Sequence, residues 1–276
     1  MRLGGTLCFS NSSEYEEKLA ASGFRAITAP FSSDTPREEI DRLCRITADL
    51  DVTIAEVGVW RNPFDPKEGA ANLAYAKRQL RLADDLGIPC CVNIAGTVSE
   101  AGWDAADKCN FTREMYDRIV SSLREIIDDV KPRTAYYTLE PMPWMVPDSP
   151  EGCLQLMKDV DREHFAVHMD FVNMINCPRR YLAAEEFIEE CFSLLGPWIK
   201  STHLKDSRMH PTSLTTLLTE CSPGEGSLDF VRVLQIIDRY LPKDAPVLLE
   251  HMSTFEEYQT AYDYVAEKAK EAGVGI

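Results

Sequence analysis

The sequence predicts an α/β fold, a parallel eight-stranded (β/α)₈ TIM barrel with an outer layer of helices. Short β-rich runs alternate with longer amphipathic segments along the whole chain, which is typical of a parallel sheet with helical crossovers. The chain has 276 residues, close to the roughly 250 that such a barrel needs. Neither a low-complexity linker nor an abrupt change of composition divides it, so residues 1–276 are expected to form a single domain.

Eight strands are expected, each followed by a helix. In chain order they cover residues 3–9, 25–29, 53–59, 89–94, 135–140, 165–171, 199–205 and 247–251. The three longest strand-to-helix connections follow the third, fourth and fifth strands, at residues 60–70, 95–110 and 141–149. In a barrel these loops lie on the C-terminal face, where substrates bind.

Several helices carry their own start and stop signals. Starts are marked by side chains that accept hydrogen bonds from free backbone N–H groups, or by a proline near the first turn. These residues are Ser12 or Ser13, Pro36 ahead of a helix over 37–50, Ser149, and the stretch 227–229. Ends are marked by glycine, which adopts a left-handed backbone without strain. These are Gly23, Gly87 after a helix over 73–86, and Gly273 after a helix over 255–272.

Composition excludes some partners. The chain holds 29 Lys plus Arg against 45 Asp plus Glu, a formal charge of −16, which repels phosphate backbones and anionic lipids. We therefore expect neither nucleic acid nor membrane as a partner. The first residues are too interrupted for the apolar part of a secretory leader, so none is expected. No apolar run approaches the length of a membrane span, and the nine cysteines show no Cys-x-x-Cys spacing. A cytoplasmic protein with reduced thiols is expected.

Four residues suited to metal binding lie at or near the C-terminal ends of four successive predicted strands. They are Glu140, Asp170, His203 and Glu250. A single carboxylate at a strand end is more often a helix cap or a salt-bridge partner, but capping does not readily explain all four together. Three carboxylate oxygens and one imidazole suit one divalent ion, such as Mn²⁺, Mg²⁺, Co²⁺ or Zn²⁺. Without a cation, the carboxylates would repel one another.

Other side chains are candidates for binding substrate. His168 lies two residues before the aspartate, so it should point into the barrel, either to support the site or as a core histidine. Lys205 has the strand parity of His203, and Arg208 lies just beyond it. Either could anchor a substrate carboxylate, phosphate or hydroxyl, or remain a solvated loop residue. His251 should face the outer helices.

Aromatic residues mark the three long loops. Trp60, Trp103 and Trp144 fall within them, one in each. Indole rings stack on the apolar faces of sugars, so these residues are candidates for the wall of a carbohydrate site.

The chain resembles the sugar isomerase/epimerase superfamily with a xylose-isomerase-like barrel. Besides the four ligands, the resemblance rests on Asn62-Pro63 and on four longer motifs. These are Ala-Asp-Asp-Leu-Gly at 83–87, Leu-Glu-Pro at 139–141, His-Leu-Lys-Asp at 203–206 and Pro-Gly-Glu-Gly-Ser-Leu-Asp-Phe at 223–230. The last two are the most specific, and together the motifs span nearly the whole chain.

The resemblance implies roles for the two glutamates. In the ketose epimerases of this superfamily the corresponding residues bind metal and also move protons, which would make Glu140 and Glu250 the catalytic acid and base. Many relatives carry a histidine three residues after the aspartate, where this chain has Asn173. An amide can donate a hydrogen bond to a sugar hydroxyl but is a poor metal ligand, so a single metal and a substrate-binding Asn173 are expected.

The leading hypothesis is a metal-dependent isomerase or epimerase of a small sugar, ketose or keto-polyol, acting through an enediolate. An alternative is a lyase of the inosose or dehydroshikimate dehydratase type on the same barrel. A zinc apurinic endonuclease is opposed by the small number of histidines, five, and by the charge of −16. A non-catalytic sugar-sensing or structural barrel is a further alternative, and homo-oligomerisation stays open.

Overall fold

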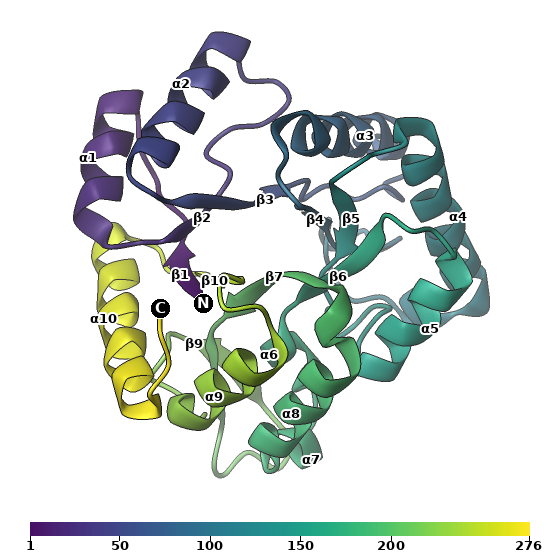
Figure 1. The fold of residues 1–276 in the computed structure, drawn as a ribbon. Coiled ribbons are helices and arrows are strands. Elements are labelled where there is room, and N and C mark those ends of the chain that lie inside the picture. Colours follow the sequence, from purple (N-terminus) through teal and green to yellow (C-terminus); the bar gives the residue numbers. More distant parts are fainter.

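The computed structural model describes residues 1–276 and contains a closed barrel of eight parallel strands (Figure 1). The strands are β1 (Arg2–Gly5), β2 (Ala26–Thr28), β3 (Thr53–Gly58), β4 (Cys90–Asn93), β5 (Tyr136–Leu139), β6 (Phe165–Met169), β7 (Ile199–Leu204) and β10 (Pro246–Leu249). They are hydrogen-bonded in chain order, and β10 closes the ring between β7 and β1. The predicted fold class is confirmed.

Helices surround the ring of strands on all sides, as Figure 1 shows. The longer ones are α1 (Ser12–Ser22), α2 (Arg37–Asp49), α3 (Gly69–Leu86), α4 (Arg113–Val130), α5 (Pro150–Val160), α8 (Ala184–Leu195), α9 (Phe230–Tyr240) and α10 (Phe255–Ala272). Short helical turns are η1 (Lys108–Phe111), α6 (Phe171–Met174), α7 (Pro178–Tyr181) and η2 (Gly196–Trp198). None of these helices combines the length and apolar character that a membrane crossing would need.

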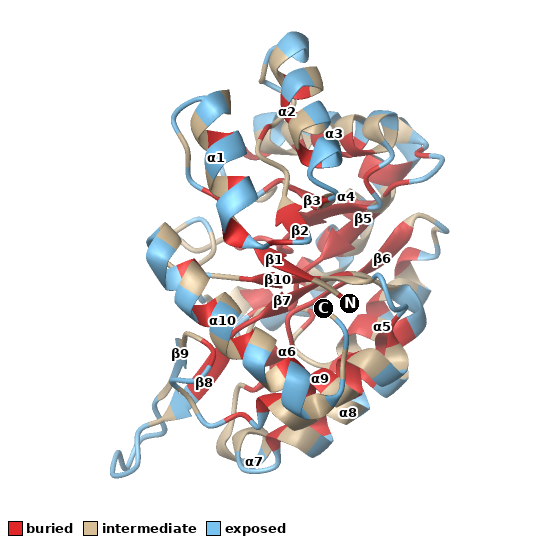
Figure 2. Ribbon diagram, turned by 60° about the vertical axis from the view of Figure 1, so that its left-hand side comes forward, coloured by how far each residue is buried: buried red, intermediate tan, exposed pale blue.

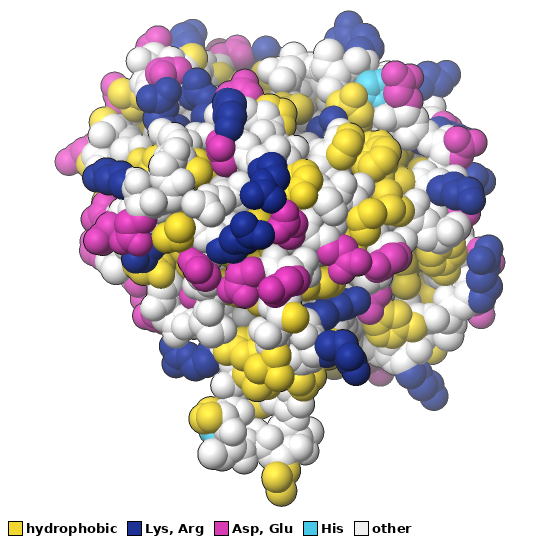
Figure 3. All heavy atoms as spheres, turned by 60° about the horizontal axis from the view of Figure 1, so that its bottom comes forward, with side chains coloured by type: hydrophobic (Ala, Val, Ile, Leu, Met, Phe, Trp, Pro, Cys, Tyr) yellow, Lys and Arg dark blue, Asp and Glu magenta, His cyan; other side chains and the backbone are white.

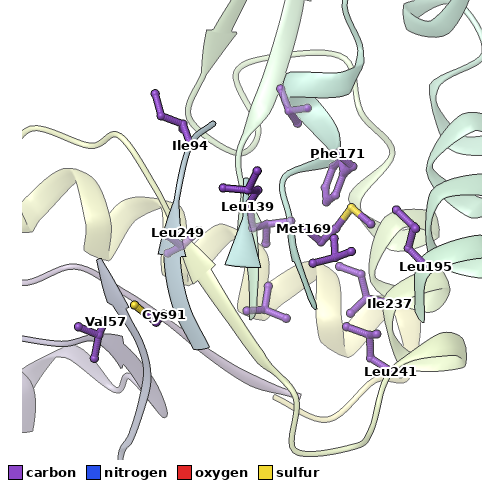
Figure 4. Packing of buried hydrophobic residues seen from close by; sticks show 14 of the residues in the cluster. Val57, Cys91, Ile94, Leu139, Met169, Phe171, Leu195, Ile237, Leu241 and Leu249 are labelled. Carbon is purple, nitrogen blue, oxygen red and sulfur yellow. The ribbon is translucent and has the colours of Figure 1, made fainter. Parts of the chain in front are cut away.

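The hydrophobic core lies between the strands and the inner faces of the helices. In Figure 2 the strands of the barrel are almost entirely buried, whereas the helices alternate between buried and exposed faces. Figure 4 shows one part of this layer, where Phe171, Leu195, Ile237 and Leu241 pack together beside the barrel. Burying a side chain of this size contributes roughly 1.5–3 kcal/mol, so the layer holds the strand ends in fixed positions.

Most of the predicted helix boundaries are confirmed. Gly23, Gly87 and Gly273 end their helices in the left-handed conformation, with φ of 72°, 69° and 70°. The Ser149 side chain caps α5. The predicted cap of the first helix is wrong by one residue, because the Asn11 side chain accepts the hydrogen bonds of the first free N–H groups.

A hairpin that the sequence did not reveal is inserted between β7 and α9. It consists of the antiparallel strands β8 (Asp206–Met209) and β9 (Leu218–Cys221), and its tip protrudes at the lower edge of Figures 2 and 3. Asp206 accepts hydrogen bonds from the backbone N–H groups of Gly224, Gly226, Ser227 and Leu228, which fixes the turn before α9. Gly226 is required there, because a Cβ would lie 2.1 Å from the Asp206 carboxylate.

The contact between the end of α3 and the chain before β5 leads to a stability prediction. The Asp84 carboxylate, in the 83–87 motif, accepts hydrogen bonds from the backbone N–H groups of Arg133, Thr134 and Ala135 and from the Thr134 hydroxyl. Burial alone would raise the pKa of Asp84, but these hydrogen bonds outweigh it and hold the pKa well below its ordinary value. The carboxylate thereby fastens the end of α3 to the chain entering β5.

We expect Asp84→Asn to lower the free energy of unfolding by about 1–3 kcal/mol at neutral pH, measured by urea denaturation. A group with a depressed folded pKa stabilises fully above its unfolded pKa of about 4, and that contribution fades as the pH falls below it. The difference between wild type and variant should therefore narrow below about pH 4. Asp85→Asn, at the exposed neighbouring position, is the control, and an equal loss in both variants would contradict the prediction.

Candidate metal centre and active site

The four predicted metal ligands meet at the C-terminal end of the barrel. Glu140 directly follows β5, Asp170 follows β6, His203 lies in β7, and Glu250 follows β10. One ligand atom from each lies within 4.8 Å of the others. The His203 Nδ1 atom is 3.2 Å from a Glu140 oxygen and 3.0 Å from a Glu250 oxygen.

This cluster is almost shielded from water. The side chains of Asp170, His203 and Glu250 are 0%, 3% and 13% exposed. Burial raises the pKa of Asp170, and the negative charges of Glu140 and Glu250 raise it further, despite the opposing ammonium of Lys205. Crowded carboxylates of this kind, beside one imidazole, form a donor set that fits a hard or borderline divalent cation.

Lys205 lies inside the cluster rather than in open space. Its Nζ atom is 2.8 Å from Asp170 Oδ2, 2.8 Å from Glu250 Oε2 and 2.9 Å from Glu220 Oε2, and its side chain is 1% exposed. The ammonium therefore balances part of the carboxylate charge. Burial opposes ionisation of Glu250, but the positive charges of His203 and Lys205 prevail and hold the pKa of Glu250 well below its ordinary value.

A cavity of about 690 Å³ opens beside the ligands. Trp60, Trp103 and Trp144, from the three long loops, all line it. Glu140, His203 and Glu250 line it as well, together with Asn173, whose Nδ2 atom lies 3.4 Å from a Glu140 oxygen. The cavity thus combines flat apolar surfaces with the polar cluster, as carbohydrate sites do.

Of the other predicted residues, Arg208 and His168 do not line the cavity, whereas His251 lines it against expectation. Arg208 donates hydrogen bonds to the Glu225 carbonyl and does not line the cavity. His168 points into the barrel, as expected, and contacts Glu56. The expected orientation of His251 is wrong: it lines the cavity and lies 2.6 Å from a Glu220 oxygen. Strand alternation does not apply to His251, because β10 ends at Leu249 and the histidine has a φ of 62°.

Sequence reasoning missed Glu56 and Glu220. Glu56 is 1% exposed, and its two oxygens lie 3.0 Å from His203 Nε2 and 3.0 Å from His168 Nε2. An acidic residue in the middle of the apolar strand Thr53–Gly58 is the signal that could have indicated it. Glu220 belongs to the inserted hairpin, whose two strands carry no clear alternation of apolar and polar residues.

Comparisons with known proteins agree with the barrel fold. A family model described as "Xylose isomerase-like TIM barrel" matches residues 17–268. The chain belongs to this family. No curated protein matches by sequence.

Solved structures of the family share the fold at low sequence identity. A xylose isomerase-like TIM barrel protein from Mycobacterium smegmatis, in complex with magnesium, is 14% identical with a TM-score of 0.72 over 98% of this chain and 97% of that one. D-psicose 3-epimerase from Clostridium cellulolyticum, with D-tagatose, is 15% identical with a TM-score of 0.69 over 97% and 99%. The probable 3-DHS dehydratase AsbF from Bacillus anthracis is 14% identical with a TM-score of 0.73 over 96% and 99%.

We expect Mn²⁺ to raise the melting temperature of the wild-type protein, because an ion that binds only the folded state stabilises it. Asp170→Asn should weaken Mn²⁺ binding by more than about tenfold, since it removes the fully buried anionic ligand. Titration calorimetry measures the affinity. Asp104→Asn, which changes another carboxylate of the cavity wall outside the ligand cluster, should bind Mn²⁺ like wild type. The predicted site is wrong if Mn²⁺ neither binds nor stabilises the wild-type protein.

Proposed function

We propose that this protein is a divalent-metal-dependent isomerase or epimerase of a small neutral sugar, ketose or keto-polyol. The observation that carries the proposal is the pair Glu140 and Glu250. Both carboxylates line the cavity and flank the Nδ1 atom of His203, but they come from β5 and β10, which are separated in the ring by β6 and β7. A substrate between them has a carboxylate within reach from two directions.

The chemistry of the two glutamates follows from this arrangement. A bound divalent ion would supply polarisation of the substrate carbonyl and neighbouring hydroxyl, which acidifies the adjacent C–H. One glutamate accepts that proton at a carboxylate oxygen, giving an enediolate. If the other glutamate carries a proton at the start and donates it on the opposite face, the carbon is inverted, an epimer forms, and the two glutamates have exchanged protonation states. If the first glutamate returns its proton to the neighbouring carbon, an aldose and a ketose interconvert.

Other residues of the cavity fit a sugar substrate. The Asn173 amide can donate a hydrogen bond to a substrate hydroxyl, and the tryptophans offer surfaces for the sugar ring. The similar structures of a D-psicose 3-epimerase and of a magnesium complex support the proposal at the level of shared fold. The similar structure of a probable 3-DHS dehydratase keeps a lyase as the second candidate.

Charge in the cavity favours a neutral substrate. No lysine or arginine lines it, whereas Glu56, Asp104, Glu140, Glu220 and Glu250 all do. The nearest ammonium, that of Lys205, is already held by three carboxylates. Even with a divalent ion bound and His251 protonated, these five carboxylates together with Asp170 would outnumber the positive charges of the ion, Lys205 and His251, so a substrate carboxylate or phosphate would be repelled. The negative charge of the cavity therefore disfavours a substrate that carries a carboxylate, such as a dehydroshikimate-like one.

The proton-transfer roles are tested by screening ketoses, aldoses and inososes with Mn²⁺ in D₂O. We expect deuterium to enter at a carbon next to the carbonyl of the accepted substrate, detected by NMR. Glu140→Gln and Glu250→Gln should each slow this exchange by about 10²–10⁴-fold, because each removes an acid/base group. Asp85→Asn, which changes an exposed carboxylate of α3 outside the cavity, is the matched control and should retain wild-type exchange.

Two results would count against the proposed reaction. Wild-type exchange in both glutamine variants would exclude the proposed acid/base pair. A product that has lost water would instead identify the lyase alternative.

The negative charge of the cavity leads to a separate prediction about the charge of the preferred substrate. A neutral ketose should have a kcat/KM at least about fivefold higher than its phosphate ester or a keto acid of equal chain length, since one uncompensated like charge costs roughly 1 kcal/mol or more in such a site. Glu220→Gln removes one carboxylate from Lys205 and should narrow this preference. Glu225→Gln, an exposed residue of the following turn, should leave it unchanged. A wild-type preference for the anionic substrate would contradict the argument.

A further inference from the structure

A buried hydrogen-bonded network lies behind the metal ligands, on the side of His203 away from them. It joins Glu56 of β3, His168 of β6, and Ser201 and His203 of β7, and each of the four is at most 3% exposed. Glu56 Oε1 lies 3.0 Å from His203 Nε2, while Glu56 Oε2 lies 3.0 Å from His168 Nε2 and 2.5 Å from Ser201 Oγ. None of these contacts of Glu56 takes part in the proton transfer proposed for Glu140 and Glu250.

The chemistry of a carboxylate determines the direction of these hydrogen bonds. Ionised Glu56 can only accept, so His203 Nε2, His168 Nε2 and the Ser201 hydroxyl must all donate. When a cation replaces the Nδ1 proton of the His203 imidazolium, the remaining ring proton is therefore on Nε2. The lone pair of Nδ1 then faces Glu140 and Glu250, at the position where a cation would be shared. The other tautomer would set an Nε2 lone pair against a carboxylate and an N–H against the cation.

Packing holds the ring of His203 in the same orientation. The rings of His168 and His203 meet edge to face, with centroids 4.0 Å apart and planes at 74°. Trp60 lies near the same imidazole, with ring centroids 6.3 Å apart. Glu56 accepts hydrogen bonds from both histidines. Removing its charge would therefore allow His203 to adopt the other tautomer and would also remove one restraint on the plane of its ring.

We propose that Glu56 is a positioning residue for the metal centre, which fixes the tautomer and orientation of His203 and thereby raises the affinity for a divalent cation. The proposal rests on the metal site of the proposed function but not on its substrate or reaction. It also explains a buried carboxylate in the middle of an apolar strand, because such a group is costly unless it is fully hydrogen-bonded.

A second ion between Glu56, His168 and His203 is the competing explanation, since their ligand atoms also lie within 4.8 Å of one another. The geometry favours hydrogen bonds, because each Glu56 oxygen is already at hydrogen-bond distance from a histidine nitrogen. Titration of wild-type protein with Mn²⁺ separates the two. One ion per chain supports the positioning role, and two ions per chain overturn it.

The variant Glu56→Gln provides the direct test. Glutamine keeps the size but offers one acceptor oxygen and an NH₂ group, so it cannot accept from both histidines. We expect Mn²⁺ to bind about 10–100-fold more weakly in titration calorimetry of the full chain. Ser201→Ala removes one donor and leaves both histidine contacts, so its affinity should stay near wild type. Thr47→Val breaks the buried Tyr15–Thr47 hydrogen bond far from the site and controls for lost stability alone.

Unchanged Mn²⁺ affinity in Glu56→Gln would overturn the proposal, as would an equal loss in Thr47→Val. A spectroscopic test needs no altered Glu56. In zinc-loaded wild-type protein with ¹⁵N-labelled histidine, two-bond ¹H–¹⁵N spectra should show His203 with its proton on Nε2 and the metal on Nδ1, the signal being assigned with His203→Gln. The reverse arrangement would exclude the role even if Glu56→Gln fails to fold. Because metal is the only ligand in these experiments, their outcome is independent of whether the protein is an epimerase.

Discussion

The convergence of carboxylates at one end of the barrel is the constraint on which the rest of the site depends. Closing the sheet brings the C-terminal ends of β5, β6, β7 and β10 together, and three of them end in Glu140, Asp170 and Glu250. Such charges are unfavourable in a buried position unless they are compensated. The Lys205 ammonium and the imidazole of His203 compensate part of this negative charge, and the cluster fits a divalent cation that would compensate more of it.

The inserted β8–β9 hairpin contacts this charged cluster through a side chain of its own. Its tip is exposed, yet Glu220 of β9 reaches both Lys205 and His251. His251 also lies 3.2 Å from a Glu250 oxygen, so a chain of charged contacts runs from the hairpin to the candidate base. A segment that resembles a surface loop in the sequence therefore contributes a wall of the cavity and part of its charge. The charged residues on the face in Figure 3, by contrast, are of both signs and interspersed.

The sequence predicted the features that depend on short stretches of chain. Apolar runs located the eight strands, glycines located helix ends, and strand position placed the four ligands at one end of the barrel. The partners of Glu56 could not be found in this way, because they lie 112 and 147 residues away and only closure of the barrel brings them together. The orientation of His251 was missed because its backbone departs from strand geometry directly after Glu250. Contacts between residues far apart in the sequence, and local departures from regular strand geometry, therefore could not be predicted from sequence patterns.

Lys205 also bears on how such a site can form before a cation binds. Asp170 and Glu250 are held by the same ammonium at 2.8 Å each, so the folded chain compensates part of the charge with its own residues. One ammonium cannot balance three ligand carboxylates and Glu220 together, and the surplus negative charge remains available to attract a divalent ion. Full compensation by lysines or arginines would stabilise the metal-free protein more but would remove the attraction for the ion. The single buried lysine therefore supports folding without a metal while preserving the charge that a metal site needs.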